Sequence, residues 1–219
     1  VYYPVGWHEE RGGTDASSLD RGRTRSISTT IVRIALVTPE EPFHVPPALD
    51  ALCRARGREL VGVVILPAFN ERLVATVRRL YEFYGPVDFA RLALRHLGAA
   101  LADRANRLRP FTRSYSASDV ARRHGIPVYR PAKINSPEFV TLLREHIRPD
   151  LLVTLATSQV LRQRVLDVPR LGCINLHPAP LPRYQGMMPT FWTMMHGEPE
   201  ATVTVHYMVE KLDAGDIVL

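Results

Sequence analysis

The sequence of 219 residues has two cysteines, two lysines and no long apolar run. Cys53 and Cys173 stand far apart and match no spacing of a metal site, redox pair or disulfide framework. They fit a reducing, cytoplasmic compartment, and we expect no bound metal. The strongest apolar run, from Leu60 to Phe69, contains Gly62 and Pro67 and falls short of the roughly 18 to 20 residues that a membrane span needs. These absences exclude a transmembrane protein, and we expect no membrane partner.

Because lysine is scarce, the net positive charge is weak evidence for a nucleic-acid partner. The chain has 28 basic and 22 acidic residues, a net charge of +6, and all the basic residues except Lys133 and Lys211 are arginines. A net positive charge raises the possibility of a nucleic-acid partner. Because the arginines are spread along the whole chain, they resemble a compositional bias more than a binding stripe. The charge therefore leaves a nucleic-acid partner open without favouring one.

The composition, 46% apolar and 23% charged, is that of a globular protein, and the length suits one large domain. Residues 1–30 are rich in Gly, Ser, Thr, Arg and Asp without sustained periodicity, which predicts a loose leader or extension. The chain begins with Val1 and stops at Leu219 within an apolar run, so either end is consistent with truncation of a longer protein. Residues 31–219 are predicted to form one α/β domain.

Strand and helix signals alternate from Ile31 onward, which predicts a doubly wound, mostly parallel twisted sheet with helices on both faces, a three-layer α/β/α fold. We expect strands at residues 32–37, 60–66, 127–129, 151–155, 172–176 and 202–208. We expect helices at residues 46–56, 71–84, 87–108, 160–166 and 189–195, with Gly85 and Pro86 breaking the longest stretch. Two more helices are predicted to start after the N-caps Ser116 and Ser136.

The residues with most chemical content end one of these strands. Asn175 and His177 are two positions apart, so their side chains share one face, and Pro178 stops the strand behind them. In open α/β sheets ligands bind beyond the carboxyl ends of the strands. An amide that stabilises an oxyanion beside an imidazole that moves a proton suits acyl transfer. Without further context, the preferred interpretation is structural, with Asn175 capping the turn and His177 as a hydrogen-bonded edge histidine.

The surrounding residues favour the catalytic interpretation. The stretch from Asn175 to Gly186, NLHPAPLPRYQG, resembles the N-x-H-x-S-x-L-P-x-x-x-G signature of formyltransferases that use 10-formyltetrahydrofolate, a family with methionyl-tRNA, glycinamide ribonucleotide and amino-sugar members. Further blocks agree in order, at residues 149–151, 156–161, 165–173, 203–206 and 212–216. The similarity runs from about Ile134 to Leu219 and weakens back to Ile31. It implies a Rossmann-like formyltransferase fold, with residues 31–219 as a catalytic domain that is consistent with truncation at its C-terminus.

Carried over residue by residue, the resemblance makes Asn175, His177 and Asp213 the catalytic residues. It implies transfer of a formyl group from a folate nitrogen to a primary amine through a tetrahedral intermediate. Asn175 would donate to the oxyanion, His177 would stabilise that charge and carry a proton, and Asp213 would favour the charged imidazole and position water. Asp216 is the rival acid; Asp213 is preferred because it holds the L-D-x-G position.

The resemblance also implies how the donor 10-formyltetrahydrofolate is held. Its pterin would contact main-chain groups of Gln159, Val160 and Leu161, and Leu212 and Asp213 would complete the donor site. Read without the family, Ser158 is a helix N-cap, and Val160 and Leu161 are core residues. Ala179 departs from the signature serine, which bears on substrate contacts more than on chemistry. His206 is interpreted as a structural histidine, with a water or proton role as the alternative.

The acceptor amine is less well specified. The segment from Thr38 to His44 lacks glycine and carries two acids, which disfavours a glycinamide ribonucleotide phosphate there. An amino sugar or other small amine and methionyl-tRNA remain about equally supported. A possible tRNA contact surface comprises Arg91, Arg95, Arg104, Arg107, Arg109 and Arg113, but a solvated helix face is the preferred interpretation, so tRNA is possible and not favoured. A non-catalytic folate-binding or assembly module and a formyltetrahydrofolate hydrolase remain alternatives. The sequence does not give the oligomeric state.

Overall fold

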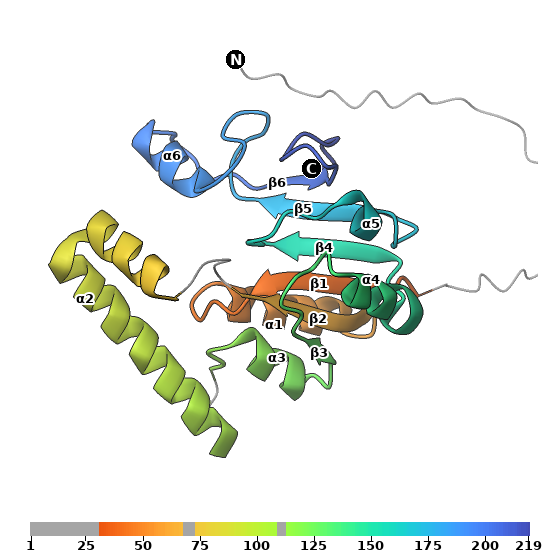
Figure 1. Cartoon of the computed structure of the whole chain (residues 1–219), viewed down its shortest axis with the longest axis horizontal. Helices are drawn as coiled ribbons and strands as arrows, with labels where there is room; N and C mark the ends of the chain where they lie inside the picture. The colour runs from red at the N-terminus through yellow and green to blue at the C-terminus, as the bar shows by residue number, and fades with distance from the viewer. Residues whose placement is uncertain (1–30, 68–72, 109–112) are drawn as a thin grey trace, which may run out of the picture. The chain divides into compact units, whose positions relative to one another are not determined.

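The centre of the fold is a six-stranded sheet in the order β3-β2-β1-β4-β5-β6. The computed structural model describes residues 31–67, 73–108 and 113–219 (Figure 1). The strands are β1 (Ile34–Pro39), β2 (Leu60–Leu66), β3 (Val128–Tyr129), β4 (Leu151–Leu155), β5 (Cys173–His177) and β6 (Thr204–Tyr207). All neighbouring pairs are parallel except β5 and β6. The predicted α/β fold with a mostly parallel sheet is confirmed.

The two faces of the sheet follow from the alternation of side chains along β1 and β2. Leu36, Val63 and Ile65 pack with α1 (Val45–Arg56) and α3 (Ala117–Arg123) in one core. Val37, Val64 and Leu66 point to the other face, which is covered by α4 (Pro137–Leu142), the π-helical turn η1 (Leu143–Ile147) and α5 (Gln163–Leu166). Helices on both faces explain why β2 is apolar at every position except Gly62.

Local sequence signals set most of the helix boundaries. Ser116 and Ser136 accept hydrogen bonds from the backbone N–H groups of Asp119 and Phe139, as expected of N-caps. The helix predicted over 160–166 is wrong in its first three residues, because α5 begins at Gln163. The side chain of Asn135 binds the Val160 carbonyl and the Arg162 N–H at 2.8 Å each, which holds this stretch extended.

The longest helix, α2 (Leu73–Leu108), is broken where the sequence predicted. Gly85 has φ 72° and ψ 172°, a conformation that interrupts the helix and that a glycine adopts readily. The predicted start at Glu71 and the whole predicted leader, residues 1–30, lie outside the described residues. No helix in the described ranges is long and apolar enough to cross a membrane.

Candidate active site

The candidate site lies at the carboxyl ends of β4 and β5, next to the point where the strand order reverses. The chain runs outward from β1 through β2 to β3, then returns to β4 on the other side of β1. Crevices at such a switch point are the usual ligand sites of open α/β sheets. Asn175 and His177 belong to β5, and β6 pairs with it so that His206 faces Asn175 and Thr204 faces His177.

Asp213 joins the predicted residues into one cluster. Its Oδ2 lies 3.7 Å from His177 Nδ1, and its Oδ1 lies 3.6 Å from Nε2 of His206. The side chains are 10%, 5% and 1% exposed for Asp213, His177 and His206, so these groups interact with little screening by water. Asp216 is exposed, and its backbone carbonyl pairs with the Tyr207 N–H. Of the two acids that the sequence offered, Asp213 is the one beside the imidazoles.

The orientation of the Asn175 amide is fixed from both sides. The Thr154 hydroxyl donates to Asn175 Oδ1 at 2.7 Å. His206 Nδ1 lies 2.8 Å from the Tyr207 carbonyl, which can only accept, so Nδ1 carries the proton. In that tautomer the other ring nitrogen, Nε2, accepts from Asn175 Nδ2 at 3.2 Å. One hydrogen of the amide is thereby used, and the second remains for a ligand.

His177 meets an acceptor at each ring nitrogen. Nε2 donates to the Tyr184 carbonyl at 2.8 Å, while Nδ1 faces the Asp213 carboxylate. The 3.7 Å between Nδ1 and the carboxylate is longer than a direct hydrogen bond. In its protonated form His177 would place positive charge next to Asp213, and direct proton transfer from Nε2 requires displacement of the Tyr184 carbonyl.

Two glycines of the predicted motifs make the position of Asp213 possible. The Gly186 N–H donates to Asp213 Oδ2 at 2.9 Å, and Gly186 has φ 99°, a value that disfavours any side chain. A Cβ on Gly215 would lie 1.9 Å from the backbone oxygen of Tyr207. Gly215 therefore lets the segment after Asp213 pack directly on β6.

The predicted donor-binding loop follows β4. The side-chain amide of Gln159 bridges the Ile134 N–H and the Ala132 carbonyl at 3.0 Å each, so it stabilises the loop. Leu161 is buried as expected, but Val160 is 48% exposed and is not core. Ser158 caps no helix, since its hydroxyl donates to the Pro67 carbonyl at 2.6 Å. Within the described residues, the Val160 and Leu161 N–H groups donate to no protein acceptor, which leaves main-chain donors for a ligand.

The structure brings in polar groups that the sequence did not assign to the site. Thr154, His206 and the Tyr184 carbonyl all contact the predicted catalytic residues. The sequence pattern of residues 202–208 predicted a strand that includes His206. Only the antiparallel register of β6 with β5, seen in the structure, puts His206 beside Asn175. Leu212, predicted to contact the donor, is half-exposed. No group of three or more His, Cys, Asp or Glu side chains able to hold a metal ion occurs in the described parts of the chain.

The start of α1 is closed to an anion by the protein itself. The Glu41 carboxylate accepts from the N–H groups of Phe43, His44 and Val45 at 2.9, 2.6 and 3.1 Å. Partial burial raises the pKa of Glu41, but these three backbone donors outweigh it and hold the pKa below its ordinary value. A carboxylate thus occupies the donors that a phosphate would need, in agreement with the sequence argument on this segment.

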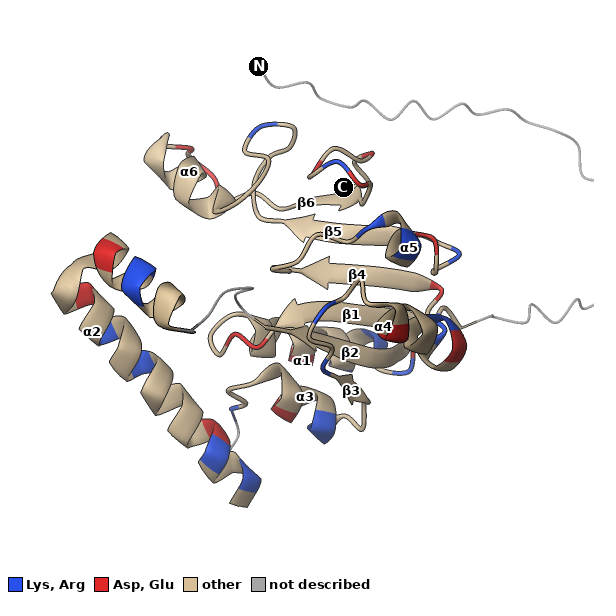
Figure 2. Ribbon diagram, in the orientation of Figure 1, with Lys and Arg blue, Asp and Glu red and all other residues tan. Residues whose placement is uncertain are grey.

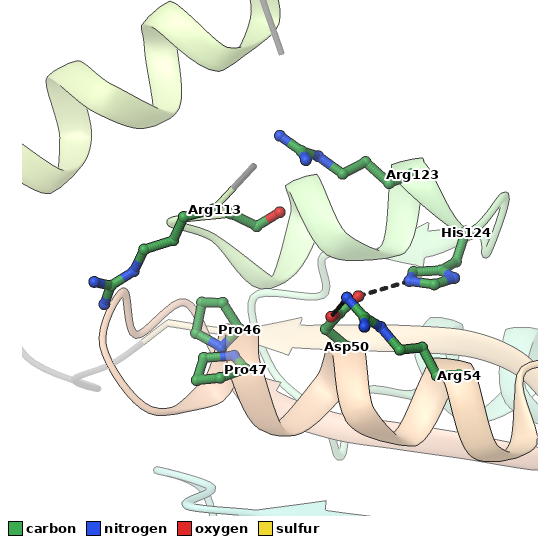
Figure 3. A pocket seen from close by; sticks show the side chains of 8 residues that line it. Pro46, Pro47, Asp50, Arg54, Arg113, Arg123 and His124 are labelled. Atoms are coloured by element: carbon green, nitrogen blue, oxygen red, sulfur yellow. Dashed lines mark hydrogen bonds and ion pairs between the residues drawn. The ribbon is translucent and has the colours of Figure 1, made fainter. Parts of the chain in front are cut away.

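A surface hollow of about 470 Å³ lies elsewhere, between α1 and α3 (Figure 3). Asp50 lies within it, 2.6 Å from Arg54 and 2.8 Å from His124. None of the predicted catalytic or donor-binding residues lines this hollow. It is separate from the candidate active site.

Comparison with known proteins agrees with this geometry. The chain is 52% identical over 99 residues to a methionyl-tRNA formyltransferase of Syntrophus aciditrophicus, a match over 45% of this chain and 31% of that protein. It is 45% identical over 100 residues to the enzyme of the same name from Geobacter metallireducens, over 46% of this chain and 32% of the relative. The chain thus matches about a third of the length of these relatives.

Solved structures share the fold at low sequence identity. A phosphoribosylglycinamide formyltransferase from Anaplasma phagocytophilum superposes with a TM-score of 0.56 at 18% identity, covering 86% of this chain and 70% of that one. A formyltetrahydrofolate deformylase from Pseudomonas syringae gives 0.51 at 21% identity, covering 88% and 51%. The family profile described as formyl transferase matches residues 87–219, more than half of the sequence. Since that match spans β3 to β6 with the whole His177–Asp213 cluster, the chain belongs to the formyl transferase family.

Proposed function

We propose that the protein transfers a formyl group from 10-formyltetrahydrofolate to a primary amine. The observation that carries the proposal is the cluster in which Asp213 contacts buried His177 and, through buried His206, Asn175 at the carboxyl ends of the central strands. Family membership supports the same chemistry. A hydrolase would need the same residues with water as acceptor, and no contact in the site favours water over an amine.

The roles of the residues follow from their contacts. The acceptor nitrogen attacks the formyl carbon, a new N–C bond forms, the bond from that carbon to the folate nitrogen breaks, and the amine proton ends on the folate nitrogen. The free hydrogen of the Asn175 amide donates to the oxyanion of the tetrahedral intermediate, and His177 supplies positive charge next to it. Asp213 keeps that charge in place and accepts the amine proton through water.

The loop after β4 is proposed to hold the donor. The unpaired N–H groups of Val160 and Leu161 would bind the pterin ring, while Gln159 and Asn135 hold the loop in shape from behind. Leu212, which directly precedes Asp213 and is half-exposed, would also contact the donor. Main-chain recognition of this kind depends on loop geometry more than on side-chain identity.

We propose methionyl-tRNA as the leading acceptor. From the sequence alone, methionyl-tRNA and a small amine were about equally supported, but the relatives with 45–52% identity over about 100 residues are methionyl-tRNA formyltransferases. An anionic glycinamide ribonucleotide is the least supported acceptor because Glu41 already fills the start of α1.

The arginines of α2 do not add support for a tRNA contact. Arg91 and Arg107 pair with Asp88 and Asp103 at 3.0 and 3.1 Å, and the Arg95 guanidinium lies 4.8 Å from the centre of the Phe43 ring. Arg104 is exposed, and Arg109 lies outside the described residues. We expect any tRNA contact to be made by other parts of the protein.

Two measurements test the proposal. The chain should bind a 10-formyltetrahydrofolate analogue by calorimetry, and it should formylate methionyl-tRNA faster than glycinamide ribonucleotide or an amino sugar when each is offered with the donor. Filter binding of initiator tRNA at two salt concentrations should be unchanged by the triple variant Arg104→Glu/Arg107→Glu/Arg109→Glu. Absence of donor binding would refute the family chemistry. Tight, salt-sensitive tRNA binding abolished by the triple variant would refute our view of α2.

A further inference from the structure

The outer face of α2 after Gly85 carries an unusual apolar strip. Four large side chains repeat there every seven residues, Val87, Leu94, Leu101 and Leu108, and Leu97 lies one turn after Leu94; all five are 56% to 88% exposed. The opposite face meets the rest of the protein, since Ala99 and Asn106 are buried and His96 stacks edge-on against Phe43. A helix that packs by one face normally exposes polar residues on the other. This exposed apolar face of α2 is therefore a candidate contact surface for another molecule.

The strip is symmetric about the point between Leu97 and Gly98. Counting outward from that point in both directions pairs Leu94 with Leu101 and Ala90 with Ala105, and Val87 pairs with Leu108. At 3.6 residues per turn, these residues together with Leu97 and Gly98 all lie within about 50° of one line along the helix. An apolar surface that reads the same in both directions is self-complementary under a two-fold rotation.

Within the described residues, no contact explains why position 98 is a glycine. It sits in the helical part of α2, where glycine costs about 1 kcal/mol relative to alanine. Its φ is not positive, and a Cβ built on it meets nothing within 4 Å. Neither backbone conformation nor packing in the described residues calls for glycine here. The close approach of another helix backbone would call for a glycine at this position.

We propose that α2 pairs with α2 of a second copy of this chain, antiparallel and crossing at Gly98. Leu97 of each copy then packs into the gap that Gly98 leaves on the other. The flanking residues Ala93, Ala100 and Ala105 are small, so the two helices can approach closely along their length. The segment from Val87 to Leu108 is about 33 Å long, enough for three heptads of contact.

The charges on α2 fit this partner better than a nucleic acid or a membrane. The middle of the segment, from His96 to Ala102, carries no Lys, Arg, Asp or Glu, and this part of α2 is tan in Figure 2. The antiparallel arrangement brings Asp88 near Arg107 of the other copy and Arg91 near Arg104, so the flanking charges neither favour nor oppose the pair, and the uncharged middle carries the argument. A basic groove for phosphates or a ring of arginines for anionic lipid would place cations along the strip instead.

The mass of the protein in solution tests the pairing. Sedimentation should give a species of twice the 24.7 kDa chain mass, and Leu97→Glu/Leu101→Glu should convert it to the single-chain mass. Gly98→Leu should do the same although leucine favours helix more than glycine does. The matched control Val74→Glu changes an equally exposed apolar residue of α2 before the break and should leave the dimer intact. A wild-type chain that stays monomeric at all concentrations would overturn the proposal. So would a dimer unaffected by the strip variants.

Cysteine cross-linking tests the direction of the pair. Mixing Val87→Cys with Leu108→Cys should yield a disulfide-linked heterodimer under mild oxidation, whereas either variant alone should not cross-link. The native thiols give little background because burial raises the pKa of Cys53 to about 11 and that of Cys173 to about 12. Cross-linking of each variant with itself would show a parallel pair and overturn the proposed crossing. A monomer that binds anionic vesicles and loses that binding in Leu97→Glu would overturn it in favour of a membrane.

Discussion

His206 offers the sharpest test of the site, because its importance follows from the structure and not from the family motifs. Replacing it by leucine keeps the volume but removes both hydrogen bonds of the ring, at 2.8 Å to the Tyr207 carbonyl and at 3.2 Å from Asn175 Nδ2. The ring also faces Asp213 at 3.6 Å. The variant therefore disturbs the amide and the carboxylate that the proposed mechanism uses, without touching the donor loop.

The size of the effect can be estimated from these contacts. Leaving one partner of a hydrogen bond unsatisfied costs about 1–3 kcal/mol, and each 1.36 kcal/mol is a factor of ten in rate. We expect kcat to fall about 5- to 150-fold in His206→Leu with KM for the donor nearly unchanged. His206→Gln keeps an acceptor on the side chain and should recover part of the loss. The two groups left without their partner, the Asn175 amide and the Tyr207 carbonyl, should also lower Tm by a few degrees.

The assay is steady-state formyl transfer to methionyl-tRNA, with melting curves for each variant. His124→Gln is the matched control, because this histidine pairs with Asp50 outside the candidate site and should leave kcat unchanged. If His206→Leu retained turnover within a factor of two while remaining folded, His206 would be a packing residue, and our account of how Asn175 is oriented would be wrong.

Three further outcomes are expected. His177→Ala and Asp213→Asn should each lower turnover at least about 100-fold in the transfer assay, whereas Asp216→Asn should be mild; the reverse order for the two acids would refute the assignment of Asp213. Gly215→Ala should destabilise the protein by about 1–3 kcal/mol in denaturant titrations because its Cβ would collide with the Tyr207 carbonyl, and a wild-type midpoint would contradict that contact. Glu41→Gln should cost about 1 kcal/mol, or roughly 2–4 °C in Tm. Because the folded pKa of Glu41 is lowered, that difference should be present above its usual pKa of about 4.3 and vanish as the pH falls through the lower folded value; a difference that grew towards acid pH would contradict the capping role.

The fold was largely predictable because its signals are local. The apolar run at β2, the caps Ser116 and Ser136, and the break at Gly85 each depend on a few neighbouring residues. The error at Val160 has a non-local cause, since the side chain of Asn135, distant in sequence, holds that stretch out of the helix. Periodicity alone does not report such a contact.

The sequence predicted which residues form the site, but it did not predict most of the contacts between them. The family motifs indicated Asn175, His177 and Asp213, and the structure brings their side chains into one cluster around buried His206. The roles of Thr154, Tyr184 and His206 arise from strand register and from a backbone carbonyl, neither of which has a sequence signature. The outward symmetry of α2 was present in the sequence, yet exposure is needed to separate such a strip from a buried helix face.

The fate of a labelled formyl carbon tests the central claim most directly. Donor 10-formyltetrahydrofolate carrying label in the formyl group is mixed with the protein and methionyl-tRNA, and the label is followed in a single turnover for the wild type and for Asp213→Asn. We predict that the label moves to the amino group of the methionyl residue with the wild type and stays on the folate with the variant. Label that stays on the folate with the wild type, despite saturating donor binding, would contradict formyl transfer and identify a folate-binding module. Label released as formate would identify a hydrolase.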